Sequence, residues 1–499
     1  MVKTGTKTNP RSPGPRQGDI LDVWITDLDA EGRGVGRLGA RDDSGSQGGA
    51  VVFIPGALPG DRVKARVTRP RATFLEAELV GLVQPAPGRV APVCPAAGTC
   101  GGCHLLALAY EDQLAWKTRT VREALHRVGH LSSVPIRPCL GAERPLGYRN
   151  KAQFPVAAVP SGAARSRAAR SGAARFETRP TLRAGLFRRG THEIVPVEDC
   201  LLQHPVNNAI LAAVVRLASE FGVPAYDEDT GQGLLRHILA RVSSDGREAM
   251  AVLVTSRAAF PTGRRLAAAL REAVPEVKTV VQNVNTRRTN VILGPRNIVL
   301  SGSGFIVDRL GGLRFRVSAS SFFQVNPAQA EVLYGVVARM AEGARRAADV
   351  YCGVGTITLF LAKRLAGLDE IIGIEQNPAA ARDAAANARA NGIGNARFVC
   401  GDAGAVLEDM ARAGVELDTV VLDPPRKGCE PGVLRALLQM ECRRVVYASC
   451  NPATLARDLA VLTGAGGSDA GRPFRVVEVQ PVDMFPQTVH VEAVAELRR

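Results

Sequence analysis

A thiol and a carboxylate, each placed directly after a short apolar run, are the residues of this chain best suited to chemistry. Cys450 comes just past the run VVYA and directly before Asn-Pro, and Asp423 follows DTVVL and precedes two prolines. Each layout predicts a buried strand that stops abruptly. In an open α/β sheet, ligands bind in the crevice outside the carboxyl ends of the strands. The two strand ends therefore predict a reaction centre that contains Cys450 and Asp423.

A second group of residues predicts a cofactor site at the same edge. The segment ADVYCGVGTITLFLAKRL reads as a strand, a turn with Gly353 and Gly355, and a helix, and glycine lets a ligand approach the backbone closely. Glu375 ends the next apolar strand, where an acid can bind both hydroxyls of a ribose. Asp402 ends a third strand, where it would meet the adenine edge. Because no phosphate-gripping G-x-G-x-x-G is present, these strand-end acids favour S-adenosylmethionine over NAD.

A thiol beside a methyl donor has a specific use. Carbon 5 of uracil is too poor a nucleophile to attack a sulfonium methyl unaided, but addition of the Cys450 sulfur to carbon 6 converts the ring into an enolate whose carbon 5 can attack. The surplus proton on carbon 5 then requires a base. The segment PVDMFPQTVHVEAVAEL offers Glu492 on a late strand, with His490 two residues earlier on the same face. The other cysteines of this half are expected to be buried and inert: Cys352, Cys400, Cys429 and Cys442.

A cysteine cluster predicts a metal site. CPAAGTCGGC contains three cysteines with the spacing C-x5-C-x2-C, namely Cys94, Cys100 and Cys103. Thiolates in such sets bind zinc or an iron–sulfur cluster, and spacing alone leaves both open. The spacing differs from the C-x3-C-x2-C of radical adenosylmethionine enzymes. Candidates for a fourth ligand are Cys139, Cys200 and His104.

Composition indicates the partner rather than the fold. The formal charge of +15 fits a polyanion, and nucleic acid is favoured over a membrane surface because no amphipathic basic helix stands out. An Arg-rich proteome is the alternative explanation of the charge. No stretch approaches about eighteen apolar residues, so no transmembrane helix is expected. Ten cysteines without secretory features predict a reducing, cytoplasmic location. A monomer is the default expectation.

Patterning along the chain predicts an α/β protein in three parts. Residues 1–17 read as a disordered basic tail rather than a signal peptide. Residues 18–84 alternate apolar and polar side chains between glycine-rich turns, as in a small antiparallel barrel, and the pieces EGRGVGR and FIPGALPGDRV resemble a TRAM domain, an RNA-binding module. Residues 85–312 form a central α+β part with helical spacing over 105–128, a basic and aromatic strand at GYRNKAQF, and an Arg-rich flexible insert at 161–183. Residues 313–499 alternate strands and helices, which predicts a doubly wound, Rossmann-like sheet.

The combined motifs resemble one known family over about residues 18–499. DVYCGVGTITLFLA, GIEQNPAAARDAAANARANGI, LDPPRKG, SCNPATLARDL and MFPQTVHVEAVAEL are similar to the RNA (uracil-5-)-methyltransferase family, and most similar to its 23S ribosomal RNA branch with an amino-terminal TRAM domain. The resemblance implies that Cys450 is the nucleophile and that Glu492 removes the carbon 5 proton. It also implies a set of cofactor contacts: Gln324, Tyr351, Thr356, Glu375, Asp402 and Asp423. Family members often carry Asn where Thr356 stands.

The resemblance also decides between the two metals. In the family this cysteine pattern holds a 4Fe-4S cluster, and the fourth cysteine lies in a segment like VEDCLLQ. It therefore implies Cys94, Cys100, Cys103 and Cys200 as ligands. Because methyl transfer needs no electrons, the expected role is structural, with help in gripping RNA.

The sequence thus predicts adenosylmethionine-dependent methylation of carbon 5 of a uridine, in a nucleotide flipped out of any stack. The TRAM-like barrel favours 23S rRNA, and tRNA is the alternative. An RNA cytosine-5 methyltransferase would usually carry a second cysteine after DPPRKG, and none occurs before Cys429. A non-catalytic RNA-binding factor is the remaining alternative, and the joint presence of Cys450, Glu492 and the strand-end acids disfavours it.

Overall fold

The computed structural model describes residues 14–39, 49–159, 181–465 and 472–499. The expected basic tail and the expected Arg-rich insert lie almost wholly outside the described residues. The chain divides into two compact units: the first contains residues up to Gly98, Cys103–Asp112 and Gln487–Val489, and the second contains the rest.

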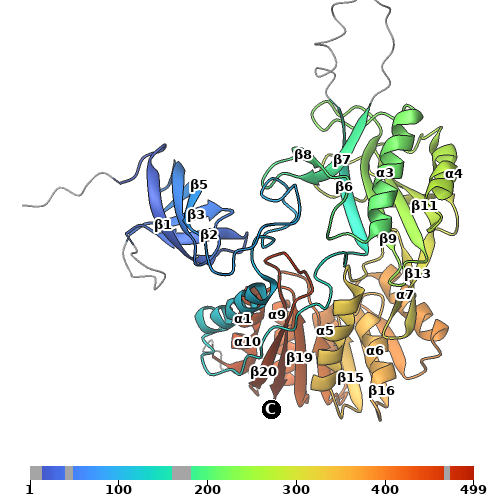
Figure 1. Ribbon diagram of the computed structural model, residues 1–499. Helices are drawn as coiled ribbons and strands as arrows, with labels where there is room; N and C mark the ends of the chain where they lie inside the picture. Colours follow the sequence, from blue (N-terminus) through green and yellow to red (C-terminus); the bar gives the residue numbers. More distant parts are fainter. Residues whose placement is uncertain (1–13, 40–48, 160–180, 466–471) are drawn as a thin grey trace, which may run out of the picture. The chain divides into compact units, whose positions relative to one another are not determined.

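The first unit is built on a closed five-stranded barrel (blue in Figure 1). Its strands run in the order β1-β2-β3-β5-β4: β1 (Ile20–Leu28), β2 (Arg33–Arg37), β3 (Val51–Pro55), β4 (Arg62–Pro70) and β5 (Phe74–Gln84). Alternate side chains point inward along each strand, as in RVKARVTRP of β4, where Val63, Ala65 and Val67 are buried. The barrel predicted from the alternating pattern is confirmed, but it is not wholly antiparallel, because β3 and β5 pair in parallel.

The second unit begins with a mainly antiparallel sheet in the order β12-β11-β10-β9-β6-β7-β8. Its elements are β6 (Lys151–Ala158), β7 (Leu182–Phe187), β8 (Ile194–Pro196), α3 (Pro205–Glu220), β9 (Leu235–Val242), β10 (Ala249–Thr255), α4 (Gly263–Ala273), β11 (Val277–Val284) and β12 (Arg296–Ser301). Helices α3 and α4 bury apolar side chains such as Leu217 and Leu266 in the same core as Ile238. A hairpin of β13 (Phe305–Leu310) and β14 (Leu313–Ser318) follows.

The second unit ends with a seven-stranded sheet in the order β17-β16-β15-β18-β19-β21-β20 (Figure 1). Its strands are β15 (Arg346–Val350), β16 (Glu370–Glu375), β17 (Ala396–Cys400), β18 (Thr419–Leu422), β19 (Arg444–Ser449), β20 (Arg475–Val482) and β21 (Glu492–Arg498). Its helices are α5 (Pro327–Met340), α6 (Thr356–Arg364), α7 (Pro378–Ala390), α8 (Ala403–Arg412), α9 (Pro431–Gln439) and α10 (Pro452–Thr463). The five strands β15 to β19 are parallel, and β21 enters antiparallel between β19 and β20.

Both faces of this sheet are covered, because successive residues of each strand enter different cores. Ile371 packs in the core formed with α5 and α6, whereas the next residue, Ile372, packs in the core formed with α8, α9 and α10. The continuous apolar runs read from the sequence are therefore strands buried on both sides. The predicted doubly wound sheet is confirmed.

Helix α1 (Tyr110–Arg127) confirms the helical spacing expected over 105–128. Its apolar side chains Val121 and Leu125 pack in the same core as Leu455 of α10. The residues that follow α1 extend the sheet beyond β20, since Ile136 bridges Val479 and Leu140 bridges Val482, both in parallel. Residues 113–140 therefore pack with the last sheet rather than with the central one.

Membrane insertion was not expected from the sequence. Among the described residues, no helix combines the length and the apolar character needed to cross a bilayer.

Candidate active site

The site lies at the carboxyl edge of the last sheet, where the direction of strand succession reverses. Strand β15 pairs with β16 on one side and with β18 on the other, so the strand order switches between β15 and β18. Ligands bind at such switch points. The predicted residues Tyr351, Glu375, Asp423 and Cys450 all fall at this edge, each at the last residue of a strand or directly after it.

The strand register brings the predicted nucleophile and the predicted base together. Strands β19 and β21 are antiparallel, and Ser449 pairs with Ala493. This is the last pair of the ladder; Cys450 and Glu492 are the residues directly beyond it along the two strands, and the charge of Glu492 acts on the Cys450 thiol. Neighbouring strands lie about 4.8 Å apart, so this pairing fixes the spacing of the two backbones. The strand stops at Ser449, directly before Cys450, because Asn451 caps α10, accepting a hydrogen bond from the Ala453 backbone N–H at 3.1 Å.

Burial and mutual repulsion raise the pKa values of these groups. Burial raises the pKa of the Cys450 thiol to about 11, with Glu492 and Asp423 adding to the shift and Arg426 opposing it. Burial raises the pKa of Glu492, which is 6% exposed, to about 8, again with a contribution from Asp423. Burial also raises the pKa of Asp423 to about 7. Perturbed titratable groups that converge at a strand-end crevice are typical of catalytic sites.

Arg426 is a site residue that the sequence reasoning missed. Its segment, PPRKG, predicts the end of a strand and forms part of a family motif, but neither interpretation gives the arginine a role. The Arg426 guanidinium lies 3.1 Å from Nδ1 of His490, and its charge acts on both Cys450 and Glu492. Burial first, and then Arg426, lower the pKa of His490 to about 4, so the ring is neutral near pH 7. His490 itself precedes β21 rather than sharing a strand face with Glu492.

The turn after β15 has the geometry of a cofactor cradle. Tyr351, Gly353 and Gly355 all have positive φ angles, of 71°, 56° and 83°. A side chain at Gly353 would project into open space, so a ligand can approach the backbone there. The Gly353 backbone N–H donates to Glu375 at 2.9 Å, and the Asn377 backbone N–H donates to the other carboxylate oxygen of Glu375 at 2.7 Å. These bonds hold the Glu375 carboxylate at the strand end, which suits a ribose-binding acid.

Two further predicted contacts meet at Tyr334, a buried tyrosine of α5. Its hydroxyl lies 3.1 Å from the hydroxyl of Thr356, and the side chain of Gln324 also acts on it, lowering its pKa. Burial raises the pKa of Tyr334 above its usual range. Gln324 and Thr356, which lie in different parts of the chain, therefore both act on the Tyr334 hydroxyl. Two residues before Gln324, the aromatic side chain of Phe322 is 72% exposed, which the sequence did not indicate.

Asp402 has a different immediate role from the one expected. Its carboxylate accepts a hydrogen bond from the Ala405 backbone N–H at 3.0 Å and thereby caps α8. It is exposed, and it lies two residues beyond β17 rather than at the end of that strand. A cofactor contact by Asp402 stays a prediction.

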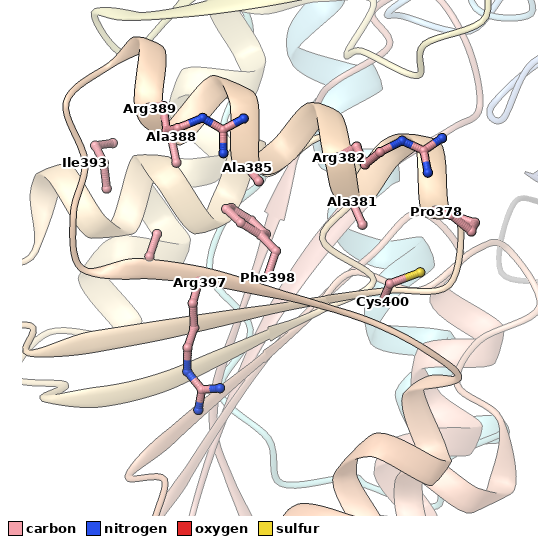
Figure 2. A pocket seen from close by; sticks show the side chains of 11 residues that line it. Pro378, Ala381, Arg382, Ala385, Ala388, Arg389, Ile393, Arg397, Phe398 and Cys400 are labelled. Atoms are coloured by element: carbon pink, nitrogen blue, oxygen red, sulfur yellow. The ribbon is translucent and has the colours of Figure 1, made fainter.

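A hollow of about 410 Å³ runs between α7 and β17 (Figure 2). Arg382 and Arg389 stand at its rim, and Phe398 closes its floor. Phe398 also lies about 3.2 Å from the position that a side chain at Gly355 would take, so it separates the hollow from the glycine turn. None of the predicted cofactor residues lines this hollow. Cys400, expected to be buried, is exposed at its mouth because β17 is the edge strand of the sheet.

The cysteine cluster is divided between the two units: Cys94 and Cys103 belong to the first, and Cys100 and Cys200 to the second. Within the second unit, burial raises the pKa of Cys200, backbone N–H groups of Leu202 and Gln203 oppose this, and the nearby Cys100 adds to it. The Gly102 backbone N–H lies 3.4 Å from the Cys100 sulfur. Across the described part of the chain, no group of three or more His, Cys, Asp or Glu side chains is arranged to hold a metal ion.

The fold and the cradle together define the adenosylmethionine-dependent methyltransferase class. A family model described as tRNA (Uracil-5-)-methyltransferase matches residues 264–499, and a TRAM domain model matches residues 16–80. An uncharacterized RNA methyltransferase from Halalkalibacterium halodurans is 40% identical, with 96% of this chain and 97% of that protein covered. Another from Geobacter sulfurreducens is 39% identical, with 97% and 91% covered.

A solved structure shares the fold over nearly the full length. The tRNA (uracil-54, C5)-methyltransferase of Pyrococcus abyssi, in complex with S-adenosyl-L-homocysteine, has a TM-score of 0.70 and 25% identity, with 96% of this chain and 100% of that chain covered. The chain belongs to the RNA (uracil-5-)-methyltransferase family. It is an RNA methyltransferase with adenosylmethionine as methyl donor, as the sequence predicted.

Proposed function

We propose that the protein methylates carbon 5 of a uridine in 23S rRNA through a covalent adduct between Cys450 and the uracil ring. The observation that carries the proposal is the register of β19 and β21, whose last pair, Ser449 and Ala493, adjoins Cys450 on one strand and Glu492 on the other. A nucleophile and a base on adjacent hydrogen-bonded strands suit a reaction that needs one group at carbon 6 and the other at carbon 5 of the same ring.

The residues divide the reaction as follows. Cys450 gives its proton to solvent and its sulfur attacks carbon 6, which moves the C5–C6 π electrons into the enolate; the charge of Arg426, which lowers the pKa of the thiol, stabilises the thiolate. When bound, adenosylmethionine supplies the electrophilic methyl group. Glu492 in its ionised form then takes the carbon 5 proton, the C–H electron pair forms the C5–C6 double bond, and the C6–S bond breaks to release Cys450.

The test uses RNA that carries 5-fluorouridine. Fluorine cannot leave as a cation, so the base has no proton to remove and the methylated adduct persists. We expect one RNA strand per chain to stay attached on a denaturing gel, in an adenosylmethionine-dependent manner, for wild type but not for Cys450→Ala. Normal methylation of ordinary RNA by an enzyme that never forms this adduct would refute the covalent route.

A tRNA uridine is the second candidate, because the structural relative from Pyrococcus abyssi is named for tRNA uracil-54. The amino-terminal barrel supports ribosomal RNA by analogy with the 23S branch. Methyl transfer from labelled adenosylmethionine to purified 23S rRNA and to total tRNA, each lacking 5-methyluridine, distinguishes the two. Label in tRNA alone would replace the first candidate by the second, and label in cytidine would exclude both.

We also propose that Cys94, Cys100, Cys103 and Cys200 bind a 4Fe-4S cluster. The proposal is supported by the C-x5-C-x2-C spacing, by the proximity of Cys100 to Cys200, and by backbone N–H groups directed at both sulfurs, which is the environment that tunes such clusters. Anaerobically purified protein should be brown with about four irons per chain. Colourless, zinc-loaded and active protein would contradict the assignment. No step of methyl transfer depends on it.

A further inference from the structure

The loop between β20 and β21 is held by an unusual set of hydrogen bonds. Four consecutive backbone carbonyls of this loop, those of residues 483–486, each accept a hydrogen bond from a different side chain. The donors and distances are Gln329 to Asp483 (3.0 Å), Asn326 to Met484 (3.1 Å), Lys117 to Phe485 (3.1 Å) and Tyr148 to Pro486 (3.0 Å). These donors come from three separate stretches of the chain, so the loop is fastened on several sides.

Lys117 differs from the other donors because it is charged and has no exposed surface. Its ammonium lies 2.5 Å from the Asp483 carboxylate, and neither side chain is exposed at all. The same carboxylate oxygen accepts a hydrogen bond from the Phe485 backbone N–H at 3.2 Å. Lys117 and Asp483 therefore close a ring of hydrogen bonds around residues 483–485. Because a buried ion pair often adds little net stability, stabilisation alone does not explain why Lys117 and Asp483 are paired here.

The held segment directly adjoins the catalytic ladder. Asp483 follows Val482, the last residue of β20, and Val482 pairs with Glu492 at the start of β21. Glu492 thus stands between Val482 on one side and Cys450 on the other. The opposite end of the loop leads through His490, whose ring meets both Arg426 and Phe485. A shift of residues 483–485 would therefore change the positions of Glu492 and of its neighbours.

We propose that Lys117 is a positioning residue: it fixes the loop of residues 483–486 so that Glu492 faces carbon 5 of the uracil bound to Cys450. Asn326 and Gln329, which share this task, follow Gln324 closely in sequence, and Asn326 also caps α5 by accepting from the Gln329 backbone N–H. The same loop is therefore tied to the Gln324 segment of the proposed cofactor site. This inference rests on the proposed function and assigns a role to a helix that precedes the central sheet.

The step most sensitive to the position of Glu492 is the breakdown of the methylated adduct. Until the carbon 5 proton passes to Glu492, the C6–S bond to Cys450 cannot break. A misplaced Glu492 should thus leave sulfur addition and methyl transfer largely intact while the adduct accumulates on ordinary RNA. A purely structural role for Lys117 would lower the amount of folded enzyme without changing this ratio of steps.

The experiment compares three full-length variants with wild type. Lys117→Met removes the donor but leaves the Asp483 charge buried, so Lys117→Met/Asp483→Asn serves as a second variant that removes the charge as well. Arg236→Met is the matched control: Arg236 is also a buried cation, it donates to the carbonyls of Asn285 and Arg287 at 2.9 and 2.6 Å, and it lies in the central sheet on β9. Single-turnover reactions with unmodified RNA are quenched and the adduct is measured on denaturing gels.

We expect both Lys117 variants to release the adduct at least about tenfold more slowly than wild type, because a misplacement of about 1 Å can cost more than that. Affinities for RNA and adenosylmethionine should stay within about twofold, and Arg236→Met should release the adduct at the wild-type rate. Release at the wild-type rate by the folded double variant would overturn the inference while leaving the proposed function intact. A wild type that transfers no methyl group to RNA would overturn both.

Discussion

The raised pKa of Glu492 predicts that adduct breakdown depends on pH in a specific way. Burial raises this pKa to about 8, and only the ionised carboxylate can accept the carbon 5 proton. One pH unit below the pKa, about one carboxyl in eleven is ionised, and one unit above it about ten in eleven. Adduct breakdown should therefore accelerate about tenfold between pH 7 and pH 9 and level off above that.

A pH jump isolates this step. The adduct is first allowed to form on ordinary RNA at pH 6, where Glu492 is protonated and breakdown is slow. The sample is then mixed into buffers between pH 6 and pH 10, and the loss of the attached RNA is followed on denaturing gels. Because the adduct already exists, the Cys450 thiol, whose pKa is about 11, does not enter the measurement.

Glu492→Gln provides the control for the assignment. The amide keeps the shape of the side chain but cannot accept the proton, so its adduct should persist and show no pH dependence. The reasoning fails if the wild-type adduct breaks down equally fast at pH 6 and pH 9. It also fails if Glu492→Gln releases its product at the wild-type rate.

Three further outcomes are expected. Cys450→Ala should abolish methyl transfer and leave RNA binding within a few fold in a filter-binding assay, and near-normal turnover would contradict the nucleophile assignment. Arg426→Gln should move the midpoint of the pH dependence above 8, because Arg426 lowers the pKa of Glu492, and an unchanged midpoint would show that its charge does not act there. The pKa of Glu492 in the folded protein, about 8, exceeds the ordinary 4.5, so the wild-type protein loses stability as pH rises through 8. In thermal unfolding, the melting temperature of Glu492→Gln should therefore rise relative to that of wild type from pH 6 to pH 9. A constant difference between the two would refute the shift.

The strand-end residues were predictable because their signals are local. An apolar run followed by Cys450-Asn-Pro or by Asp423-Pro-Pro marks the end of a buried strand without any knowledge of its neighbours. Glu375 ends β16 as expected, and Glu492 begins β21. The continuous apolar patterning likewise sufficed for the doubly wound sheet, and alternation sufficed for the barrel.

The pairing of those elements was not predictable from local signals. Nothing in the sequence around Glu492 states that β21 enters antiparallel beside β19, which is what places this residue near Cys450. The contact between Lys117 and Asp483 joins residues 366 positions apart, and neither residue has a local motif. The exposure of Cys400 was also unpredictable, because it follows from the edge position of β17, and that position depends on the strand order of the whole sheet.

The residues that follow α1 are hydrogen-bonded to β20, and this has a practical consequence for protein engineering. Backbone hydrogen bonds from Arg137 to Val479 and from Leu140 to Pro481, at 2.9 and 3.0 Å, cover what would otherwise be an open sheet margin. An excised fragment that starts at the hairpin β13–β14 would bare this margin, and bare margins recruit other copies into aggregates. A minimal soluble fragment should therefore retain α1 and its trailing residues, supplied either in one chain or as a separate complementing peptide.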